Sequence, residues 1–456
     1  MPKITIVGAG SVVFSRNLIS DCLAYPELRN STFCLFDIDE GRLKTAGVMA
    51  QQLAKAWNAN PRIEGTLDPR VAFDGADYVI FTFQVGGYEP STVIDFEIPK
   101  KYGLRQTIGD TLGIGGIFRA LRTIPVMLGY AYLMEDLCPN AVILNYVNPM
   151  AMNTWALLAG SNMRAIGLCH SVQGSYRHLA EAIGVNPDEV NYTCAGINHM
   201  AYYLTLEHDG EDLYPRIFEK VANGEYAPEW DRVRLDMMMR IGYYITESSE
   251  HFSEYVPWYI KGSQPELIDQ FKVPLDEYPR RCVSQNASWN AMADDLAAGK
   301  GFEDLHQSSE YGSRIIHAIE TGIPTLVHGN VLNDHLIDNL PDGCCVEVPC
   351  YIDRNGIQPI KVGTLPPHLA AMNRSNINVQ ELVVNAVLTG TKDYVYHAAM
   401  MDPHTGAELS LEQIWGLVDD LFDAHGDMIP LFHGHHHGEG CGCGDDCGCG
   451  DDCGCE

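Results

Sequence analysis

The sequence predicts an α/β fold in which a doubly wound parallel sheet forms the N-terminal part and a mixed α+β domain follows it. Short apolar runs of strand length alternate with helix-length segments through the first 196 residues, which is the pattern of a parallel sheet with crossover helices. The first strand leads through a Gly-x-Gly turn into a helix. Polar residues follow the ends of several predicted strands, where open parallel sheets bind their ligands. Together these observations indicate a sheet with a site along one edge.

Length and composition set the broad class of the protein. The 456 residues, of which 46% are apolar and 20% charged, can bury a large core and predict more than one domain. We expect an N-terminal sheet domain over residues 1–196, a covering α+β domain over 197–430 and a disordered tail over 431–456. A formal net charge of −30 argues against nucleic acid and anionic membranes as partners.

The same composition bears on the compartment. No apolar run approaches the roughly 20 residues of a membrane helix, and the N-terminus enters a strand without a secretory segment. Nine of the fifteen cysteines are scattered through the body of the chain without the spacing of a disulfide framework. Because such cysteines suit a reducing compartment, we expect a cytoplasmic protein.

The first element is a strand over residues 3–7, followed by the turn Gly8-Ala9-Gly10-Ser11 and a helix over 12–23. Turn glycines let the backbone approach a pyrophosphate, whose charge is met by the free N–H groups of the helix start. A second strand over 32–36 ends in Asp37, which is placed to accept from a ribose 2′-hydroxyl and so favours NAD over NADP. An ordinary glycine turn with a solvated aspartate is the alternative. The residues expected to bind the cofactor are Gly8, Gly10, Ser11 and Asp37.

The alternation then continues and completes a Rossmann-like sheet of the lactate and malate dehydrogenase type. The predicted elements are a helix over 41–56, a strand over 78–83, a helix over 117–134 and strands over 141–145 and 165–169. A glycine-rich segment over 109–116 lies before the second of these helices and predicts a functional lid or anion site, with a plain connector as the alternative. Asn148 follows the strand over 141–145 and either points into the cleft or caps the next helix.

A cysteine and two histidines also follow strand ends. Cys169 and His170 close the strand over 165–169, and His199 follows another predicted strand over 190–196. One thiolate and one imidazole would leave several positions open on a Mn²⁺-like ion, as a catalytic metal site requires. The alternative is that Cys169 is a small buried hydrophobe and His199 a core histidine.

These segments together resemble glycoside hydrolase family 4, the glycosidases that depend on NAD and a divalent metal ion. The resemblance covers about residues 1–430 and rests on the Gly-Ala-Gly-Ser turn, Asn145-Tyr-Val-Asn-Pro149, Cys169-His-Ser-Val172 and Gly196-Ile-Asn-His199. The Cys-His-Ser-Val segment is similar to the α-galactosidase (melibiase) branch. The family's glycine-rich loop usually begins with glutamate, whereas this chain has Asp110.

The resemblance implies a small oligosaccharide as substrate and an unusual reaction. In this family NAD⁺ removes hydride from C3 of the sugar, a base takes the C2 proton, the C1 substituent leaves by elimination, and water addition and hydride return follow. The implied metal ligands for Mn²⁺ or another divalent ion are Cys169 and His199. The implied acid is His170 and the implied base Tyr255, with Tyr259 as its competitor. The expected substrate contacts are Asn148, Asp110 and Arg280, with Arg281 as an alternative to Arg280.

The second half of the chain reads as a mixed domain that covers the nucleotide. Two of its segments, 379–388 and 411–422, are amphipathic helices that pack either on this domain or on another subunit, and we expect a homodimer or homotetramer. The predicted elements of the domain are helices over 229–245, 287–298, 309–321, 379–388 and 411–422 and strands over 325–328 and 345–349. The tail carries four histidines over 433–437 and Cys-x-Cys pairs over 441–456, which predict soft-metal binding or, alternatively, an acidic solubilising tail.

Several other functions stay open at this point. Within the family these are an α-galacturonidase and an α-glucosidase. Outside it they are an NAD-dependent 2-hydroxy-acid dehydrogenase, which shares the N-terminal sheet but needs an arginine-rich clamp for a carboxylate, and a metal store based on the tail alone.

Overall fold

The computed structural model describes residues 1–11, 14–302 and 305–429. The tail expected to bind soft metal ions lies outside these ranges. A twelve-stranded sheet crosses the molecule in the order β3-β2-β1-β4-β5-β6-β10-β11-β7-β8-β9, and β12 pairs with β11. The strands are β1 (Lys3–Val7), β2 (Thr32–Phe36), β3 (Arg62–Thr66), β4 (Tyr78–Phe81), β5 (Val142–Asn145), β6 (Arg164–Gly167), β7 (Asn191–Ile197), β8 (Met200–His208), β9 (Glu211–Asp212), β10 (Thr325–Leu332), β11 (Cys345–Asp353) and β12 (Gly356–Pro359).

The first six strands confirm the predicted doubly wound sheet. They are all parallel and lie in the order 3-2-1-4-5-6, which is the order of dinucleotide-binding sheets. Strands β1, β4 and β5 are largely apolar and buried along almost their whole length, because helices cover both faces of the sheet. The edge strand β3 is largely polar and half exposed, so its sequence does not predict a strand. The helices of this half are α1 (Phe14–Ala24), α2 (Glu40–Ala56), α3 (Pro69–Phe73), α4 (Val93–Lys101), α5 (Gly113–Leu137), α6 (Met150–Gly160) and α7 (Ser171–Ala182).

The glycine-rich segment differs from its prediction. Helix α5 begins at Gly113 and not at Ile117, so half of the expected loop is the first turn of a helix. A Cβ atom at Gly115 would lie 2.3 Å from the carbonyl oxygen of Gly109, and one at Gly116 would lie 2.8 Å from the backbone of Thr111. The glycines therefore let residues 109–112 fold back tightly onto the helix start.

The second half continues the same sheet. Strand β10 is antiparallel to β6 through the pair Asn330–Gly167, and β11 pairs along the whole of β10 and meets β7 at Glu347–Gly196. The division of the chain between residues 196 and 197 falls within β7 and stays a prediction. The helices of this half are α8 (Tyr214–Ala222), α9 (Arg232–Ile241), α10 (Ser249–Tyr255), α11 (Glu266–Phe271), α12 (Glu277–Ala297), α13 (Gly312–Thr321), α14 (Pro367–Thr389), α15 (Asp393–Met401), α16 (Pro403–Glu408) and α17 (Leu411–His425).

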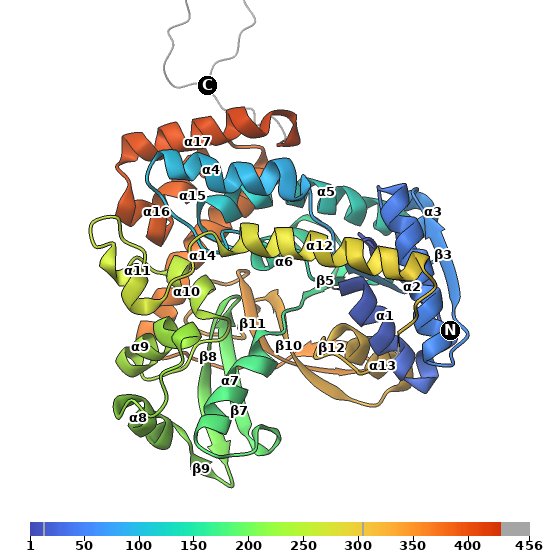
Figure 1. The fold of residues 1–456 in the computed structure, drawn as a ribbon, viewed down its shortest axis with the longest axis horizontal. Helices are drawn as coiled ribbons and strands as arrows, with labels where there is room; N and C mark the ends of the chain where they lie inside the picture. Colours follow the sequence, from blue (N-terminus) through green and yellow to red (C-terminus); the bar gives the residue numbers. More distant parts are fainter. Residues whose placement is uncertain (12–13, 303–304, 430–456) are drawn as a thin grey trace, which may run out of the picture.

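Several helix boundaries were predicted wrongly. The segment expected to be helical over 229–245 ends at Ile241, because Gly242 adopts a left-handed backbone with φ of 83° and closes the helix. Helix α12 begins ten residues earlier than expected, at Glu277. It crosses in front of the sheet in Figure 1, from the neighbourhood of α10 and α11 to α2, and so ties the two halves together.

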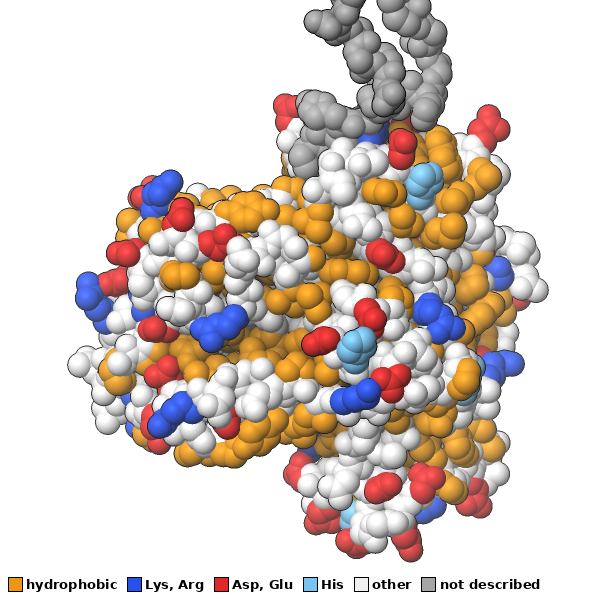
Figure 2. Space-filling view, turned by 180° about the vertical axis from the view of Figure 1, so that it is seen from behind, with side chains coloured by type: hydrophobic (Ala, Val, Ile, Leu, Met, Phe, Trp, Pro, Cys, Tyr) orange, Lys and Arg blue, Asp and Glu red, His pale blue; other side chains and the backbone are white. Residues whose placement is uncertain are grey.

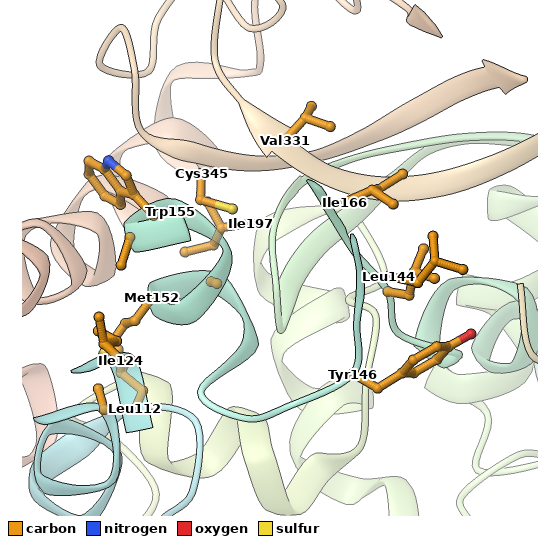
Figure 3. Packing of buried hydrophobic residues seen from close by; sticks show 14 of the residues in the cluster. Leu112, Ile124, Leu144, Tyr146, Met152, Trp155, Ile166, Ile197, Val331 and Cys345 are labelled. Carbon is orange, nitrogen blue, oxygen red and sulfur yellow. The ribbon is translucent and has the colours of Figure 1, made fainter. Parts of the chain in front are cut away.

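One hydrophobic core spans both halves. Figure 3 shows Leu144 and Ile166 from the N-terminal strands in the same region as Val331 and Cys345 from the second half, with Ile197 from β7 nearby. Each of these side chains is less than 9% exposed. The helices and strands beyond residue 197 therefore bury the open side of the N-terminal sheet instead of forming a detached unit.

The charged side chains on the surface agree with the acidic composition of the chain. On the face seen in Figure 2, lysine and arginine side chains stand apart from one another and are interspersed with acidic ones. Within residues 1–11, 14–302 and 305–429, no helix combines the length and apolar character that a bilayer crossing requires.

Candidate active site

The turn after β1 places two glycines, Gly8 and Gly10, at the carboxyl end of the sheet. Gly8 has φ of 79°, and a Cβ atom there would lie 2.7 Å from Cα of Phe83. A Cβ atom at Gly10 would lie 2.6 Å from Cβ of Arg42. The N–H of Ser11 donates to the carbonyl of Gly8 at 2.9 Å. A side chain has no room at either glycine, so the turn forms a cradle of the kind that a pyrophosphate approaches.

Asp37 closes β2 beside this cradle. Its carboxylate accepts from the N–H of Gly10 at 2.7 Å and from that of Asp39 at 3.0 Å. Arg42 donates to the carbonyl of Gly10 at 3.0 Å. Each carboxylate oxygen has a further lone pair, which leaves Asp37 able to accept from a ribose hydroxyl. The four residues expected to bind a cofactor thus lie side by side, three in the turn after β1 and Asp37 at the end of β2.

Cys169 and His199 come together, and Glu247 joins them. Cys169 follows β6, His199 lies between β7 and β8, and Glu247 precedes α10. Sγ of Cys169 lies 3.6 Å from Nδ1 of His199 and 3.6 Å from Oε2 of Glu247, and that oxygen lies 3.2 Å from Nδ1 of His199. Among the described residues these three form the one cluster able to hold a metal ion. We call Cys169, His199 and Glu247 the ligand cluster.

The electrostatics of the ligand cluster suit a cation. Burial, followed by the charge of Glu247, raises the pKa of Cys169 to about 12. Burial also acts to raise the pKa of Glu247, but the imidazoles of His199 and His251 outweigh it and lower that pKa to about 2. A divalent ion would favour the thiolate, because metal binding displaces the proton of a coordinating thiol. One sulfur, one nitrogen and one oxygen donor therefore fit a divalent metal with open coordination positions.

Tyr255 lies beside the ligand cluster. Its hydroxyl donates to Oγ1 of Thr111 at 2.9 Å and accepts from the N–H of His199 at 3.4 Å. Burial raises its pKa far above the usual range, so the phenol needs a nearby cation to act as a base. Tyr259, the competing candidate, donates to Asp236 at 2.9 Å and does not contact the ligand cluster.

Asp110 and Asn148 extend the polar surface away from the ligand cluster. Nδ2 of Asn148 donates to Oδ2 of Asp110 at 3.0 Å, and Arg119 lies 3.8 Å from the same oxygen. The other oxygen, Oδ1, is buried and accepts no hydrogen bond from any described residue. It lies 3.9 Å from Nε2 of His251, whose Nδ1 lies 3.6 Å from Glu247. The unpartnered oxygen is available to a ligand hydroxyl.

His170 and Arg280 lie outside the group formed by the ligand cluster, Tyr255, Asp110 and Asn148. The side chain of His170 is 58% exposed, and its Nδ1 lies 3.4 Å from Oε1 of Glu310. The contact with Glu310 raises the pKa of His170 to about 9, so the imidazole holds a proton at neutral pH. Arg280 pairs with Glu277 at 2.7 Å on the exposed side of α12 and does not contact the ligand cluster. Its assignment as a substrate contact stays a prediction.

Three site residues escaped the sequence analysis, namely Glu247, His251 and Arg119. Glu247 lies in a turn with φ of 67° and belongs to no motif, and only its position in space joins it to Cys169, 78 residues away. Arg119 is buried and donates to the carbonyl of Asn148 at 3.1 Å and to the hydroxyl of Tyr278 at 2.8 Å. An arginine in the middle of an apolar helix was the one available signal, because a buried charge needs a specific partner.

Comparison with known proteins identifies the family. Residues 3–185 match the family model described as family 4 glycosyl hydrolase, and residues 194–405 match that of the family 4 glycosyl hydrolase C-terminal domain. The chain is 51% identical over 432 residues to the α-galactosidase of Bacillus subtilis (strain 168), covering 95% of this chain and 100% of that protein. It is 36% identical to the α-galactosidase of Rhizobium meliloti (strain 1021), covering 94% and 89% of the two chains.

Solved structures show the same fold. An enzyme of Bacillus subtilis described as a glucosidase superposes with a TM-score of 0.83 at 26% identity, covering 92% of this chain and 99% of that chain. A 6-phospho-α-glucosidase from gut microorganisms, crystallised with NAD and Mn²⁺, superposes with a TM-score of 0.78 at 20% identity and 94% and 99% coverage. A malate dehydrogenase from Salinibacter ruber gives 0.51 at 14% identity and 85% and 98% coverage, which confirms the predicted fold class. With two family models that together match most of its length, the chain belongs to family 4 of the glycosyl hydrolases.

Proposed function

We propose that this protein is an α-galactosidase that hydrolyses terminal, melibiose-like α-galactosides by oxidation at C3 and elimination across C1 and C2. The α-galactosidase activity of the relatives at 51% and 36% identity supports the substrate class. The observation that carries the mechanism is the hydroxyl of Tyr255, which accepts from the N–H of His199 within the ligand cluster. A base directly beside a metal site is what removal of a proton next to a chelated sugar oxygen requires.

The proposed cofactors are NAD and a divalent ion such as Mn²⁺. Cys169, His199 and Glu247 would hold the ion, and the turn containing Gly8, Gly10 and Ser11, with Asp37, would hold the dinucleotide. When bound, NAD⁺ takes up and later returns a hydride at C3 of the sugar, and the ion polarises the oxygens at C2 and C3. We propose that residues 1–196 form the cofactor-binding unit and that residues 197–430 complete the site over it.

Tyr255 would remove the proton from C2. Two groups are available to hold its phenolate oxygen, because the N–H of His199 already points at that oxygen and the hydroxyl of Thr111 can turn to donate. Burial excludes bulk water from this oxygen, since Tyr255 is 1% exposed. The phenol holds this proton, which can exchange with solvent before a proton is returned to C2.

The other polar residues would bind the sugar and the leaving group. His170, which holds a proton through its contact with Glu310, would deliver that proton to the glycosidic oxygen. Asp110 and Asn148 would orient sugar hydroxyls through the free oxygen of Asp110 and the amide of Asn148. Exposure of His170 fits a group that must meet aglycones of different shape.

The proposed function is tested by hydrolysis of a panel of nitrophenyl glycosides with and without NAD⁺, Mn²⁺ and a thiol reductant. The α-galactoside should be cleaved only with all three additions, and NADH should not accumulate, because the hydride returns to the carbon it left. Product formed in D₂O should carry deuterium at C2, since the proton on Tyr255 exchanges with solvent. Steady accumulation of NADH with a 2-hydroxy acid would instead indicate a dehydrogenase. Full retention of hydrogen at C2 together with a fully active Tyr255→Phe variant would exclude the elimination route.

Two further proposals concern association and the tail. We propose a homodimer or homotetramer, a state supported by the exposed Leu411 and Trp415 on α17 and tested by light scattering. We also propose that residues 433–456 bind soft metal ions. Deletion of these residues should abolish that chelation and leave glycoside turnover unchanged.

A further inference from the structure

Glu254 is a buried carboxylate that forms no ion pair with any residue the structure describes. It lies on α10, immediately before Tyr255, and is 4% exposed. Its Oε1 accepts from the N–H of Thr107, and its Oε2 accepts from the N–H of Gly109 at 3.0 Å. One turn earlier on the same helix, the carbonyl of Glu250 accepts from the hydroxyl of Thr107 at 2.8 Å. The side of α10 that carries Glu254 is thus fixed to the backbone of residues 107–109.

That backbone leads directly into the substrate side of the site. Asp110 and Thr111 follow Gly109, and Thr111 accepts from the hydroxyl of Tyr255 at 2.9 Å. The position of residues 107–109 therefore determines where the free oxygen of Asp110 lies and where the hydroxyl of Thr111 meets Tyr255. The start of α5, which follows this segment, has its own hydrogen bond, because Oε1 of Gln106 accepts from the N–H of Gly115 at 3.1 Å.

We infer that Glu254 is a positioning residue, whose carboxylate fixes the backbone of residues 107–109 so that Asp110 and Thr111 meet the substrate and Tyr255. This inference rests on the function proposed above. Glu254 touches no reacting atom itself, and it acts through the two amides that it accepts.

The energetics favour a functional reason for this carboxylate. Burial raises the pKa of Glu254 to about 7, although the amides of Gly109 and Thr107 act to lower it. Because the pKa is above its usual range, the ionised form costs folding stability at alkaline pH. A group that is unfavourable for stability yet holds two amides of an active-site segment is explained by the geometry that it imposes.

The test compares Glu254→Gln with wild type at pH 8. The amide has the same size, but its single oxygen can accept only one of the two N–H groups, and its NH₂ opposes the other. We expect turnover of an α-galactoside to fall by about 10²-fold, the effect of a misplacement of about 1 Å. Affinities for NAD⁺ and Mn²⁺ should stay unchanged, and the melting temperature should stay equal or rise. A purely structural role would lower the melting temperature together with the turnover.

Hydrogen exchange supplies a readout that does not depend on activity. Peptides covering residues 105–112 should exchange faster in Glu254→Gln, because two protected amides lose or weaken their acceptor. The matched control is Glu408→Gln, which alters another carboxylate that accepts a backbone amide, from Gly262 at 2.6 Å, in a segment without site residues. The control should keep wild-type turnover and wild-type exchange over 105–112.

The outcomes separate this inference from the proposed function. If the wild type cleaves no α-galactoside, the proposed function fails. Hydrogen exchange over 105–112 still tests whether Glu254 fixes the backbone of residues 107–109. Wild-type turnover and wild-type exchange in Glu254→Gln would overturn the inference. If that variant does not fold, Glu254→Asp keeps the charge and withdraws the carboxylate by one methylene. Unchanged exchange and turnover in Glu254→Asp would then overturn it.

Discussion

Replacement of Glu247 by glutamine tests the ligand cluster, because this third ligand follows from the structure alone. The substitution keeps the shape of the side chain and removes the negative charge that lies 3.2 Å from Nδ1 of His199 and 3.6 Å from Sγ of Cys169. Loss of a residue that merely supports a metal ligand lowers metal affinity about 10–100-fold. Loss of a ligand itself should therefore cost about 100-fold or more in Mn²⁺ affinity.

This change in affinity converts into a measurable change in stability. At a free Mn²⁺ concentration 100 times the wild-type Kd, binding stabilises the wild type by about 2.7 kcal/mol, and a 100-fold weaker site gains about 0.4 kcal/mol. For a chain of 456 residues, whose unfolding entropy is about 1 kcal/mol/K near the melting temperature, the difference of about 2.3 kcal/mol corresponds to roughly 2–3 °C in the metal-induced rise of the melting temperature. The rise is measured for each variant against its own metal-free form, so effects of the substitution on the metal-free protein cancel.

Calorimetric titration with Mn²⁺ gives the affinity directly, and a thermal melt with and without Mn²⁺ gives the stabilisation. Glu408→Gln, which removes a carboxylate outside the ligand cluster, should match the wild type in both measurements. Equal Mn²⁺ affinity in Glu247→Gln and wild type would show that Glu247 is not a ligand and would refute the three-residue cluster.

Three further results are expected. Tyr255→Phe should lower turnover by about 10²–10⁴-fold while the loss of its hydrogen bond to Thr111 costs only about 1 kcal/mol; full activity would exclude Tyr255 as the base. Gly10→Ala should weaken NAD⁺ binding and destabilise the fold by about 1–3 kcal/mol, because the new methyl group would lie 2.6 Å from Cβ of Arg42; unchanged quenching of protein fluorescence by NAD⁺ would contradict the cradle. Burial raises the pKa of Glu254 to about 7, so the native state keeps a proton that the unfolded chain releases near its ordinary pKa of about 4.3, and the unfolding free energy should fall as pH rises through that window. Denaturant titrations at pH 5 and 8 should show a smaller fall in Glu254→Gln, and equal pH slopes would count against the raised pKa.

The N-terminal sheet was predictable because its strands are short, largely apolar runs that end in glycine or polar residues. Residues 3–7 and 78–83 were predicted as buried strands, and β4 ends two residues earlier, at Phe81. Strand β3 could not be found in this way, since its side chains are partly exposed at the sheet edge and alternate weakly. The start of α5 was missed because glycine is unfavourable in a helix by itself, and only the close approach of Gly109 to Gly115 explains it.

The site residues that belong to short sequence motifs were predictable. Those that join the site only through partners far away in the sequence were not. Cys169 and His199 belong to short segments with a recognisable pattern, and the structure brings them within 3.6 Å of each other. Glu247 and Glu254 act through partners 78 and 145 residues away, respectively. Their sequence neighbourhoods are an ordinary turn and an ordinary polar helix. Such residues become visible only when burial and partner are known.

The pairing of β6 with β10 also has a consequence for synthesis of the chain. Gly167 and Asn330 are paired across 163 residues of sequence. At translation rates of about 5–20 residues per second, roughly 8–30 s pass between synthesis of the two strands, during which the edge of β6 that faces away from β5 lacks a partner. An open edge of this kind is a template for intermolecular strand pairing. We therefore expect slow codons between these two strands to lower the yield of folded protein.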